Sequence, residues 1–193
     1  MEYENKPSRH DLIKESGWTV EDYNQLPEDG NQYEIIDGKL EFKPSPTTTH
    51  QRICSNLDHL ISQTCRMDYI IMESPIDVIL SETETRQPDL LMIHRSREHI
   101  IAEHAIIGPP DLVAEIISPS SAKRDRTMKK DSYARFGVLE YWIVDPANRT
   151  LEQYVLLQEG QPYHLAELYV DDEVVRSEHL KCVSFTVEEM LKL

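Results

Sequence analysis

The fold is decided by two stretches, Gln87-Pro88-Asp89-Leu90-Leu91-Met92-Ile93 and Asp111-Leu112-Val113-Ala114-Glu115-Ile116-Ile117-Ser118-Pro119-Ser120. Residues 112–117 are apolar except for Glu115, which is the pattern of a central strand buried on both faces. Residues 90–93 form another apolar strand, with Asp89 at its start. Burying a carboxylate is costly unless it is paired or binds a metal ion. The two acids therefore predict a divalent-metal site at the end of a sheet.

A helix is expected after residue 120, because Asp125, Lys129 and Tyr133 recur there at a spacing of four. On a helix these three side chains share one face. Lys129 would then orient an attacking water or offset charge in a transition state. Asp125 would hold Lys129 in place through an i, i+4 contact. Tyr133 is interpreted as a packing residue or a hydrogen-bond partner.

Two acids and a lysine are the minimum set for metal-assisted cleavage of a phosphodiester. A bound Mg²⁺ or Mn²⁺ stabilises negative charge on the phosphoryl oxygens and produces a hydroxide-like nucleophile near neutral pH. These ions prefer oxygen ligands and usually keep several waters. We expect Asp89 and Glu115 to supply the carboxylates and the backbone carbonyl of Ile116 to supply a third ligand.

The rest of the chain predicts one α/β domain over residues 19–193, with a mixed central β-sheet flanked by helices. A hairpin is predicted over residues 33–42, because Asp37-Gly38 is a strong two-residue turn signal. An apolar stripe at helical spacing predicts a helix over residues 48–66. Residues 1–18 are interpreted as an N-terminal leader.

Three polar residues outside this core each have two interpretations. Glu34 lies on the first strand of the hairpin and is either an exposed strand acid or a member of the site. His50 stands at a helix start, where a polar neighbour of the cap is the simpler interpretation and a supporting role is the alternative. Asp77 is flanked by apolar residues, so it either points to solvent or faces the site.

The composition is that of an acidic globular protein. The 193 residues include 35 acids and 20 bases, with a net charge of -15. No apolar run approaches the length of a membrane span, and the N-terminus lacks the apolar region of a signal peptide. The three cysteines cannot all pair, and Cys54 and Cys65 are too far apart on one predicted helix to bridge each other. A reducing cytoplasm is therefore the expected location.

One basic cluster stands out against this acidic background. It comprises Lys123, Arg124, Arg126, Lys129 and Lys130, and it lies next to the predicted site. An acidic protein that binds nucleic acid must concentrate its positive charge locally. We expect Lys123, Arg124, Arg126 and Lys130 to contact phosphates, and the alternative is a solvated helix face.

A family resemblance is carried by four stretches: Gln87-Pro88-Asp89-Leu90-Leu91, residues 111–120, Asp125 with Lys129 and Tyr133, and residues 137–146. They closely resemble the Uma2 family (DUF820), a branch of the PD-(D/E)XK, or restriction-endonuclease-like, superfamily. Residues 33–38 and Ser45-Pro46 with His50 are also similar to its N-terminal half. The resemblance covers about residues 19–193, and residues 115–146 are its most specific part.

The resemblance implies a metal-dependent, nuclease-like core in which Asp89 and Glu115 match the metal-binding acids. The superfamily usually has a lysine two residues after the glutamate, but Ile117 occupies that place here. In this family the lysine is on the following helix, which points to Lys129, with Lys130 as the neighbouring candidate. Glu34 matches the family's early glutamate, which would help with a second ion or with the attacking water.

Taken together, these patterns predict a Mg²⁺- or Mn²⁺-dependent endonuclease that hydrolyses DNA phosphodiester bonds. The resemblance further implies a homodimer, because such domains often dimerise to cut both strands. Two alternatives stay open at this point. The acidic balance and the displaced lysine favour a non-enzymatic binding module that keeps the fold, and a metal-dependent hydrolase of small phosphoesters is the third possibility.

Overall fold

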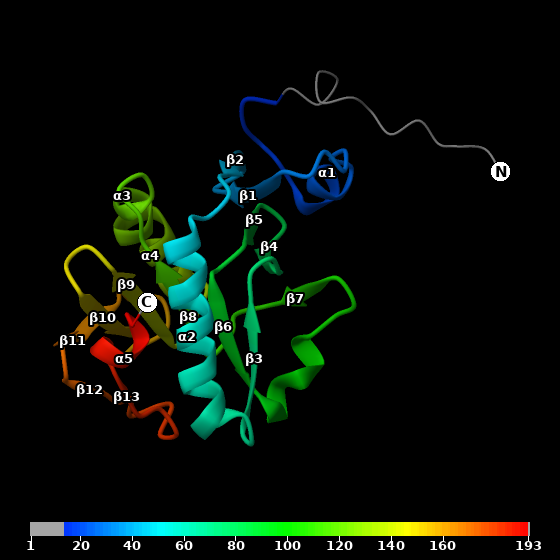
Figure 1. The fold of residues 1–193 in the computed structure, drawn as a ribbon. Helices are drawn as coiled ribbons and strands as arrows, with labels where there is room; N and C mark the ends of the chain where they lie inside the picture. Colours follow the sequence, from blue (N-terminus) through cyan, green and yellow to red (C-terminus); the bar gives the residue numbers. More distant parts are fainter. Residues whose placement is uncertain (1–13, 193) are drawn as a thin grey trace.

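The computed structural model describes residues 14–192 and shows strands and helices packed in layers, as the fold class predicted (Figure 1). The strands form two larger sheets and a small ribbon where a single mixed sheet was expected. The first sheet runs β11 (His164–Val170), β10 (Thr150–Val155), β9 (Glu140–Asp145), β8 (Leu112–Ile116), β6 (Leu90–His94) and β3 (Tyr69–Glu73). The second runs β2 (Lys39–Lys43), β1 (Gln32–Ile36), β5 (Glu84–Arg86), β4 (Asp77–Ser81) and β7 (Ala105–Ile107), and the ribbon pairs β12 (Val174–Val175) with β13 (Phe185–Thr186).

Both large sheets are mixed. In the first, β8 and β9 are parallel and every other neighbouring pair is antiparallel. In the second, β4 and β7 are parallel and the other pairs are antiparallel. The predicted hairpin is β1–β2, and its turn residues Asp37 and Gly38 have φ of 48° and 69°. Positive φ at both positions suits the right-handed twist of the strands that they join.

The helices cover the sheets at several points. They are α1 (Val20–Asn24), α2 (Thr48–Cys65), α3 (Ala122–Arg124), α4 (Lys130–Arg135) and α5 (Val187–Met190), with a 3-10 helix over Arg95–Ile100 and a π-helical turn over Asp125–Lys129. The predicted helix over residues 48–66 is therefore α2. Trp18 from the predicted leader is buried, and its backbone N–H donates to the Gly38 carbonyl. Residues 1–13 of that leader lie outside the described residues.

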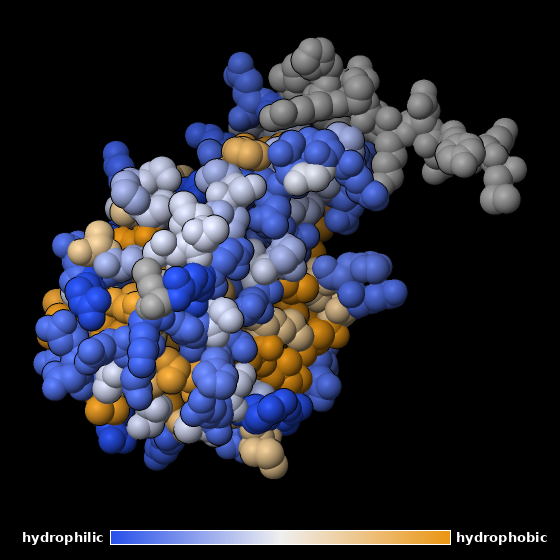
Figure 2. All heavy atoms as spheres, viewed as in Figure 1, coloured by the Kyte–Doolittle hydropathy of each residue, from blue (hydrophilic) through white to orange (hydrophobic). Residues whose placement is uncertain are grey.

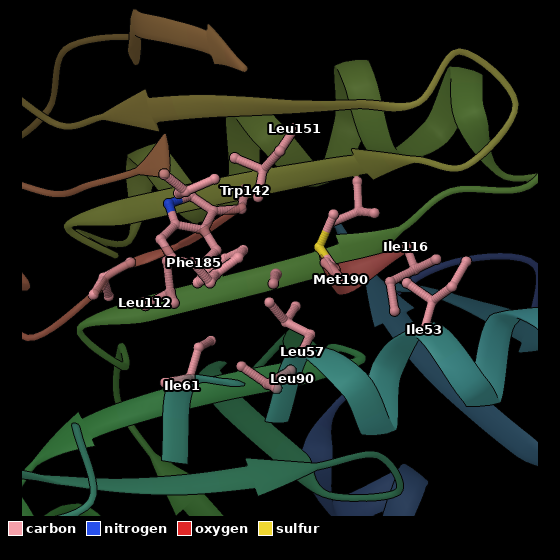
Figure 3. Close-up of a cluster of buried hydrophobic side chains, with 14 of the residues drawn as sticks. Ile53, Leu57, Ile61, Leu90, Leu112, Ile116, Trp142, Leu151, Phe185 and Met190 are labelled. Atoms are coloured by element: carbon pink, nitrogen blue, oxygen red, sulfur yellow. The ribbon is translucent and has the colours of Figure 1, made fainter. Parts of the chain in front are cut away.

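The core is divided by the six-stranded sheet. On one face, Ile53, Leu57 and Ile61 of α2 pack against Leu90, Leu112 and Trp142, together with Phe185 and Met190 from the C-terminal segment (Figure 3). On the other face, Leu91, Val113 and Ile143 pack with Tyr133 and Val138. Because β8 is buried on both faces, its sequence is a continuous apolar run interrupted only by Glu115.

Two cysteines correct the expectation of a fully reduced chain. Cys65 and Cys182 form a disulfide, with their Cα atoms 5.1 Å apart, while Cys54 is free and buried. The sequence excluded only the Cys54–Cys65 pair. The partner 117 residues away could not be found from local spacing, because the fold alone brings the end of α2 beside the C-terminal segment.

The surface reflects the composition. Figure 2 shows a largely hydrophilic face, with an apolar area beside β3 and β7. Among the helices within residues 14–192, none is long and apolar enough to cross a membrane.

Candidate active site

A cavity of about 410 Å³ opens where the two sheets meet the start of α2. Its wall comes from the start of β1, the β2–α2 connection, the first turns of α2, the loop after β3, the neighbouring ends of β6 and β8, and the segment from residue 118 through the π-helical turn. The lining residues that matter chemically are Lys43, His50, Ser74, Asp89, Glu115, Arg124, Asp125 and Lys129. Residues distant in sequence thus share one solvent-accessible recess.

Asp89 and Glu115 lie side by side because of the register of β6 and β8. Leu90 pairs with Ala114, so Asp89, one step earlier, is opposite Glu115 on the antiparallel neighbour. Residues that face each other across two strands project to the same side of a sheet. Asp89 is 4% exposed and Glu115 is 3% exposed, and both line the cavity. The convergence of these two acids agrees with the sequence prediction.

The carboxylate of Asp89 is held by three groups. Oδ2 accepts from the Ile116 backbone N–H at 2.9 Å and lies 2.9 Å from His50 Nε2. Oδ1 lies 3.3 Å from the Lys43 ammonium. Burial on its own would raise the pKa of Asp89, but His50 and Lys43 outweigh it, so the pKa is well below its usual value. Asp89 is therefore ionised throughout the physiological pH range.

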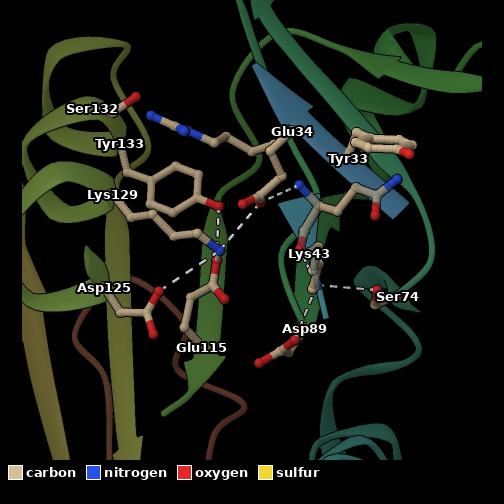
Figure 4. Close-up of polar contacts among 12 residues, drawn as sticks. Tyr33, Glu34, Lys43, Ser74, Asp89, Glu115, Asp125, Lys129, Ser132 and Tyr133 are labelled. Atoms are coloured by element: carbon tan, nitrogen blue, oxygen red, sulfur yellow. Dashed lines mark hydrogen bonds and ion pairs between the residues drawn. The ribbon is translucent and has the colours of Figure 1, made fainter. Parts of the chain in front are cut away.

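Glu115 has a different electrostatic environment. Its Oε1 accepts from the Lys129 ammonium at 2.8 Å and from the Tyr133 hydroxyl at 3.0 Å. Its other oxygen carries no contact line in Figure 4. Burial, with Asp89 and Asp125 nearby, raises the pKa of Glu115 to about 7 despite the opposing effect of Lys129. The Glu115 carboxyl thus titrates near neutral pH while Asp89 does not.

Lys129 sits at the centre of a closed group of carboxylates (Figure 4). Its Nζ lies 2.8 Å from Glu115, 3.2 Å from Glu34 and 3.8 Å from Asp125. The π-helical turn and α4 keep Asp125, Lys129 and Tyr133 on the same side, as their spacing predicted. Burial on its own would lower the pKa of Lys129, but the surrounding acids raise it well above the ordinary value. The surrounding acids thus favour the ammonium form of Lys129, which has no lone pair to accept a proton as a general base.

Glu34 approaches this group from β1, in the other sheet. Its Oε1 accepts from the Gln87 backbone N–H at 2.9 Å, while its Oε2 is buried without a hydrogen-bond partner. Burial opposes ionisation, but Lys129 and Lys43 lower its pKa below the usual value. The exposed-acid interpretation of Glu34 is wrong, because the residue is fully buried at the junction of the two sheets.

The donor set suits a hard divalent ion. Within residues 14–192, no three His, Cys, Asp or Glu side chains are arranged as a metal-binding group. Asp89 and Glu115 nevertheless supply two carboxylates on one cavity wall, and Glu115 has an oxygen that neither Lys129 nor Tyr133 occupies. Mg²⁺ is commonly held by one or two carboxylates with several waters. Asp89 and Glu115 are thus the residues that fit this ion.

Comparison with known proteins agrees with this geometry. The sequence profile of the Uma2 family, described as "Putative restriction endonuclease", matches residues 20–188. The chain belongs to the Uma2 family. Restriction-endonuclease-like proteins in general use divalent metal ions, which is consistent with the paired acids.

Two relatives extend the comparison. "Uncharacterized protein sll1609" from Synechocystis sp. (strain ATCC 27184 / PCC 6803 / Kazusa) is 25% identical over 167 residues, which cover 84% of this Uma2 chain and 94% of the relative. A crystal structure described as "a putative nuclease belonging to DUF820", from Anabaena variabilis ATCC 29413, has a TM-score of 0.73 and 21% identity. It covers 90% of this chain and 97% of its own, and the likeness shows a shared fold.

The predicted supporting residues of this Uma2 chain separate into two groups. His50 contacts Asp89 directly, although a cap neighbour was the simpler interpretation. Asp77 neither points freely to solvent nor lines the cavity: it accepts from the Tyr23 hydroxyl and from Gln87 Nε2 behind the site. The backbone N–H of Ile116 donates to Asp89 and orients it. The predicted use of the Ile116 carbonyl as a metal ligand stays a prediction.

The basic cluster is less uniform than its sequence suggested. Arg124 lines the cavity, and Lys123 is exposed on α3. Arg126 instead points to the β9–β10 hairpin, where it pairs with Asp145 at 3.1 Å and with Glu152. The Lys130 ammonium lies 4.7 Å from the centre of the Tyr154 ring. Among residues 14–192, no acidic or aromatic partner is found for the other two predicted phosphate contacts, Lys123 and Arg124.

Lys43 is the site residue that sequence reasoning missed. It ends β2, and its ammonium donates to the Gln87 carbonyl at 2.5 Å besides contacting Asp89. A lysine on a short edge strand is usually solvated. The one local signal is the Pro44-Ser45-Pro46 segment that follows, which turns the chain at this point and brings Lys43 into the recess.

Proposed function

We propose that this Uma2 protein is a Mg²⁺- or Mn²⁺-dependent endonuclease that hydrolyses phosphodiester bonds in DNA. The observation that carries the proposal is the convergence of Asp89 and Glu115 on one cavity, with the Lys129 ammonium 2.8 Å from Glu115. This set has the chemistry that phosphodiester hydrolysis requires: carboxylates for an ion and a fixed cation beside them. The nuclease-like family and fold add independent support.

Asp89 and Glu115 would hold the ion. When bound, the ion would offset charge on the phosphoryl oxygens and lower the pKa of a water molecule near neutral pH. The chain contributes preorganisation. The Ile116 N–H and His50 keep the Asp89 carboxylate in position, and the Tyr133 hydroxyl does the same for Glu115. Groups that are already oriented need no rearrangement as charge develops in the transition state.

Lys129 would stabilise developing negative charge from a fixed position. Its three carboxylate partners keep it protonated and stationary, so it contributes an electrostatic effect and no proton transfer. Glu34 and Asp125 would act as positioning residues for this ammonium. Lys129 would thus supply the positive charge that the superfamily's usual lysine provides. Ile117 occupies the position of that lysine here, two residues after Glu115.

DNA would approach from the rim of the cavity. Arg124 lines that rim and Lys123 lies exposed on the same short helix, so these two residues are proposed as phosphate contacts. The remaining charge opposes binding, because the chain carries a net charge of -15. We therefore expect weak binding at cellular salt concentrations.

The test is cleavage of single- and double-stranded DNA and RNA with and without Mg²⁺ or Mn²⁺. Asp89→Asn and Lys129→Gln should each abolish cleavage, whereas Lys39→Met, on the exposed end of β2, should leave it unchanged. Far-UV circular dichroism and thermal unfolding would show that each variant is folded. Metal binding through Asp89 without any cleavage would indicate a binding module. Hydrolysis of a small phosphodiester without polymer cleavage would indicate a small-molecule hydrolase.

We also propose a homodimer, since a second active site is needed to cut both strands of a duplex in one encounter. Sedimentation equilibrium across a range of protein concentrations would measure this directly. A mass that stays at 22.5 kDa at all concentrations would contradict it.

A further inference from the structure

Lys43 lines the cavity and lies across the site from Lys129, beside Asp89 and Ser74 (Figure 4). Its side chain is 12% exposed, and it reaches inward from the end of β2. The ammonium is held by the Gln87 carbonyl at 2.5 Å, the Ser74 hydroxyl at 3.3 Å and Asp89 Oδ1 at 3.3 Å. A lysine with three ordered oxygen partners is part of the site and not a solvated side chain.

The two oxygens of Asp89 are used differently. Oδ2 already serves two partners, since it accepts from the Ile116 N–H and lies 2.9 Å from His50 Nε2. Oδ1 therefore remains for any ion that Asp89 would bind. Its protein partner in the described structure is the Lys43 ammonium. The cation of the side chain and the cation of the cofactor thus need the same oxygen.

Two groups other than Asp89 hold the Lys43 ammonium in place, so a metal ion would not easily move it away. The shortest of its contacts is to the Gln87 carbonyl, not to Asp89, and the Ser74 hydroxyl is a further partner. Loss of the Asp89 contact would therefore leave the ammonium within the recess. A divalent ion on Asp89 Oδ1 would then face a positive charge nearby, and like charges at this separation repel strongly in a partly buried site.

From this geometry we infer that Lys43 is a resident counter-ion of Asp89 that opposes metal binding and sets the affinity of the site. The inference rests on the proposed metal site. It assigns Lys43 a positioning role in the metal-free protein, where it replaces the charge of the ion and keeps Asp89 ionised and ordered. Lys129 is not the direct counter-ion of Asp89, because its contacts are to Glu34, Glu115 and Asp125.

The experiment measures Mn²⁺ binding alone, by isothermal titration calorimetry with electron paramagnetic resonance of free Mn²⁺ as a second readout. Lys43→Gln removes the charge and keeps hydrogen-bond donors for Gln87 and Ser74. It should tighten Mn²⁺ binding by about tenfold or more, because one unit of adjacent positive charge is removed. Lys43→Arg keeps the charge and should bind Mn²⁺ with nearly the wild-type affinity.

A matched control separates direct competition from a general change in charge. Lys39→Met removes a lysine from the exposed end of the same strand. It should not tighten binding by more than about twofold, because exposed charges separated by solvent are screened. Equal tightening in Lys43→Gln and Lys39→Met would overturn the inference. If Lys43→Gln does not fold, Lys43→Met supplies the same comparison with an apolar stem of similar length.

The outcomes also distinguish this inference from the proposed function. Wild-type protein that binds Mn²⁺ with the same affinity as Lys43→Gln overturns the role of Lys43 and leaves the metal site standing. Absence of Mn²⁺ binding in both proteins at millimolar concentrations overturns the metal site itself, and the inference with it. Binding in Lys43→Gln alone supports the inference most directly.

Discussion

The two lysines of the cavity differ in how completely the fold encloses them. Lys129 is 1% exposed and contacts three carboxylates contributed by β1, β8 and its own helical turn. Lys43 is partly exposed, and one carboxylate, one hydroxyl and one carbonyl contact it. Several acids surround the Lys129 ammonium, whereas the Lys43 ammonium has one carboxylate partner and borders solvent. Lys129 therefore stabilises the buried acids of the fold, and Lys43 acts mainly on the charge of Asp89.

The largest effect is expected at the enclosed lysine. Lys129→Met would leave Glu34, Glu115 and Asp125 buried without their cation, so the free energy of unfolding should fall by about 3–5 kcal/mol. Urea denaturation followed by circular dichroism measures this change. Lys39→Met should change stability by less than about 0.5 kcal/mol. A Lys129→Met protein as stable as the wild type would show that the acids are not held together by this ammonium.

The next effect distinguishes the two acids by pH. A metal ion requires an ionised carboxylate, and Glu115, with a pKa of about 7, is protonated below neutral pH. Mn²⁺ affinity should therefore fall about tenfold for each pH unit below 7 and be flat above it. Asp89, whose pKa is lowered, should add no pH dependence in this range. Calorimetric titrations between pH 5 and 8 measure the slope.

Glu115→Gln provides the control for that prediction. The variant has no carboxyl group to titrate at this position, so its weaker Mn²⁺ binding should lose the slope between pH 5 and 7. A slope retained in Glu115→Gln would assign the titrating group to another residue. His50, which contacts Asp89 and has a raised pKa, is the first alternative.

A smaller effect is expected when the enclosed corner loses a neutral partner. Tyr133→Phe removes the hydroxyl that donates to Glu115 Oε1 at 3.0 Å and keeps the ring in the core. The free energy of unfolding should fall by about 1 kcal/mol, because one buried hydrogen bond is lost while Lys129 still pairs with the same oxygen. Thermal unfolding at pH 8 measures the change. A loss above about 3 kcal/mol would mean that the hydroxyl, and not Lys129, holds Glu115.

The smallest effect is expected in the basic cluster. Arg126 is half-buried and pairs with Asp145 and Glu152, so Arg126→Gln should cost less than about 1 kcal/mol of stability. It should leave DNA cleavage unchanged, whereas Arg124→Gln should weaken it and reduce its salt dependence. Cleavage rates at 50 and 150 mM salt compare the two. Equal losses would mean that the whole cluster, and not the cavity rim alone, contacts phosphates.

Much of the fold could be predicted because its signals are local. Apolar runs identify the central strands β6 and β8, the Asp37-Gly38 turn identifies the hairpin, and a stripe at helical spacing identifies α2. The division of the strands into two sheets could not be predicted in this way. Strand pairing depends on long-range packing, and the sequence of a single strand does not indicate which strand pairs with it.

The candidate site shows the same division. Asp89 and Glu115 stand out because a carboxylate beside a buried strand contradicts the surrounding apolar pattern. Lys43 and His50 show no such contradiction, since a lysine on an edge strand and a histidine at a helix start are ordinary surface residues. Their roles come from the position of β2 and α2 against the end of β6, where both reach Asp89.

The sequence by itself determined the central apolar strands, the β1–β2 hairpin and α2, the two acids in or beside apolar runs, and the shared side of Asp125, Lys129 and Tyr133. These properties depend on periodicity and on the cost of burying charge, and both can be judged from residues that are close together in the sequence. Tertiary structure alone decided that Lys43 joins the site, that Arg126 leaves it, and that Cys65 meets Cys182. Each of these depends on the packing of segments far apart in the chain, which no local pattern encodes.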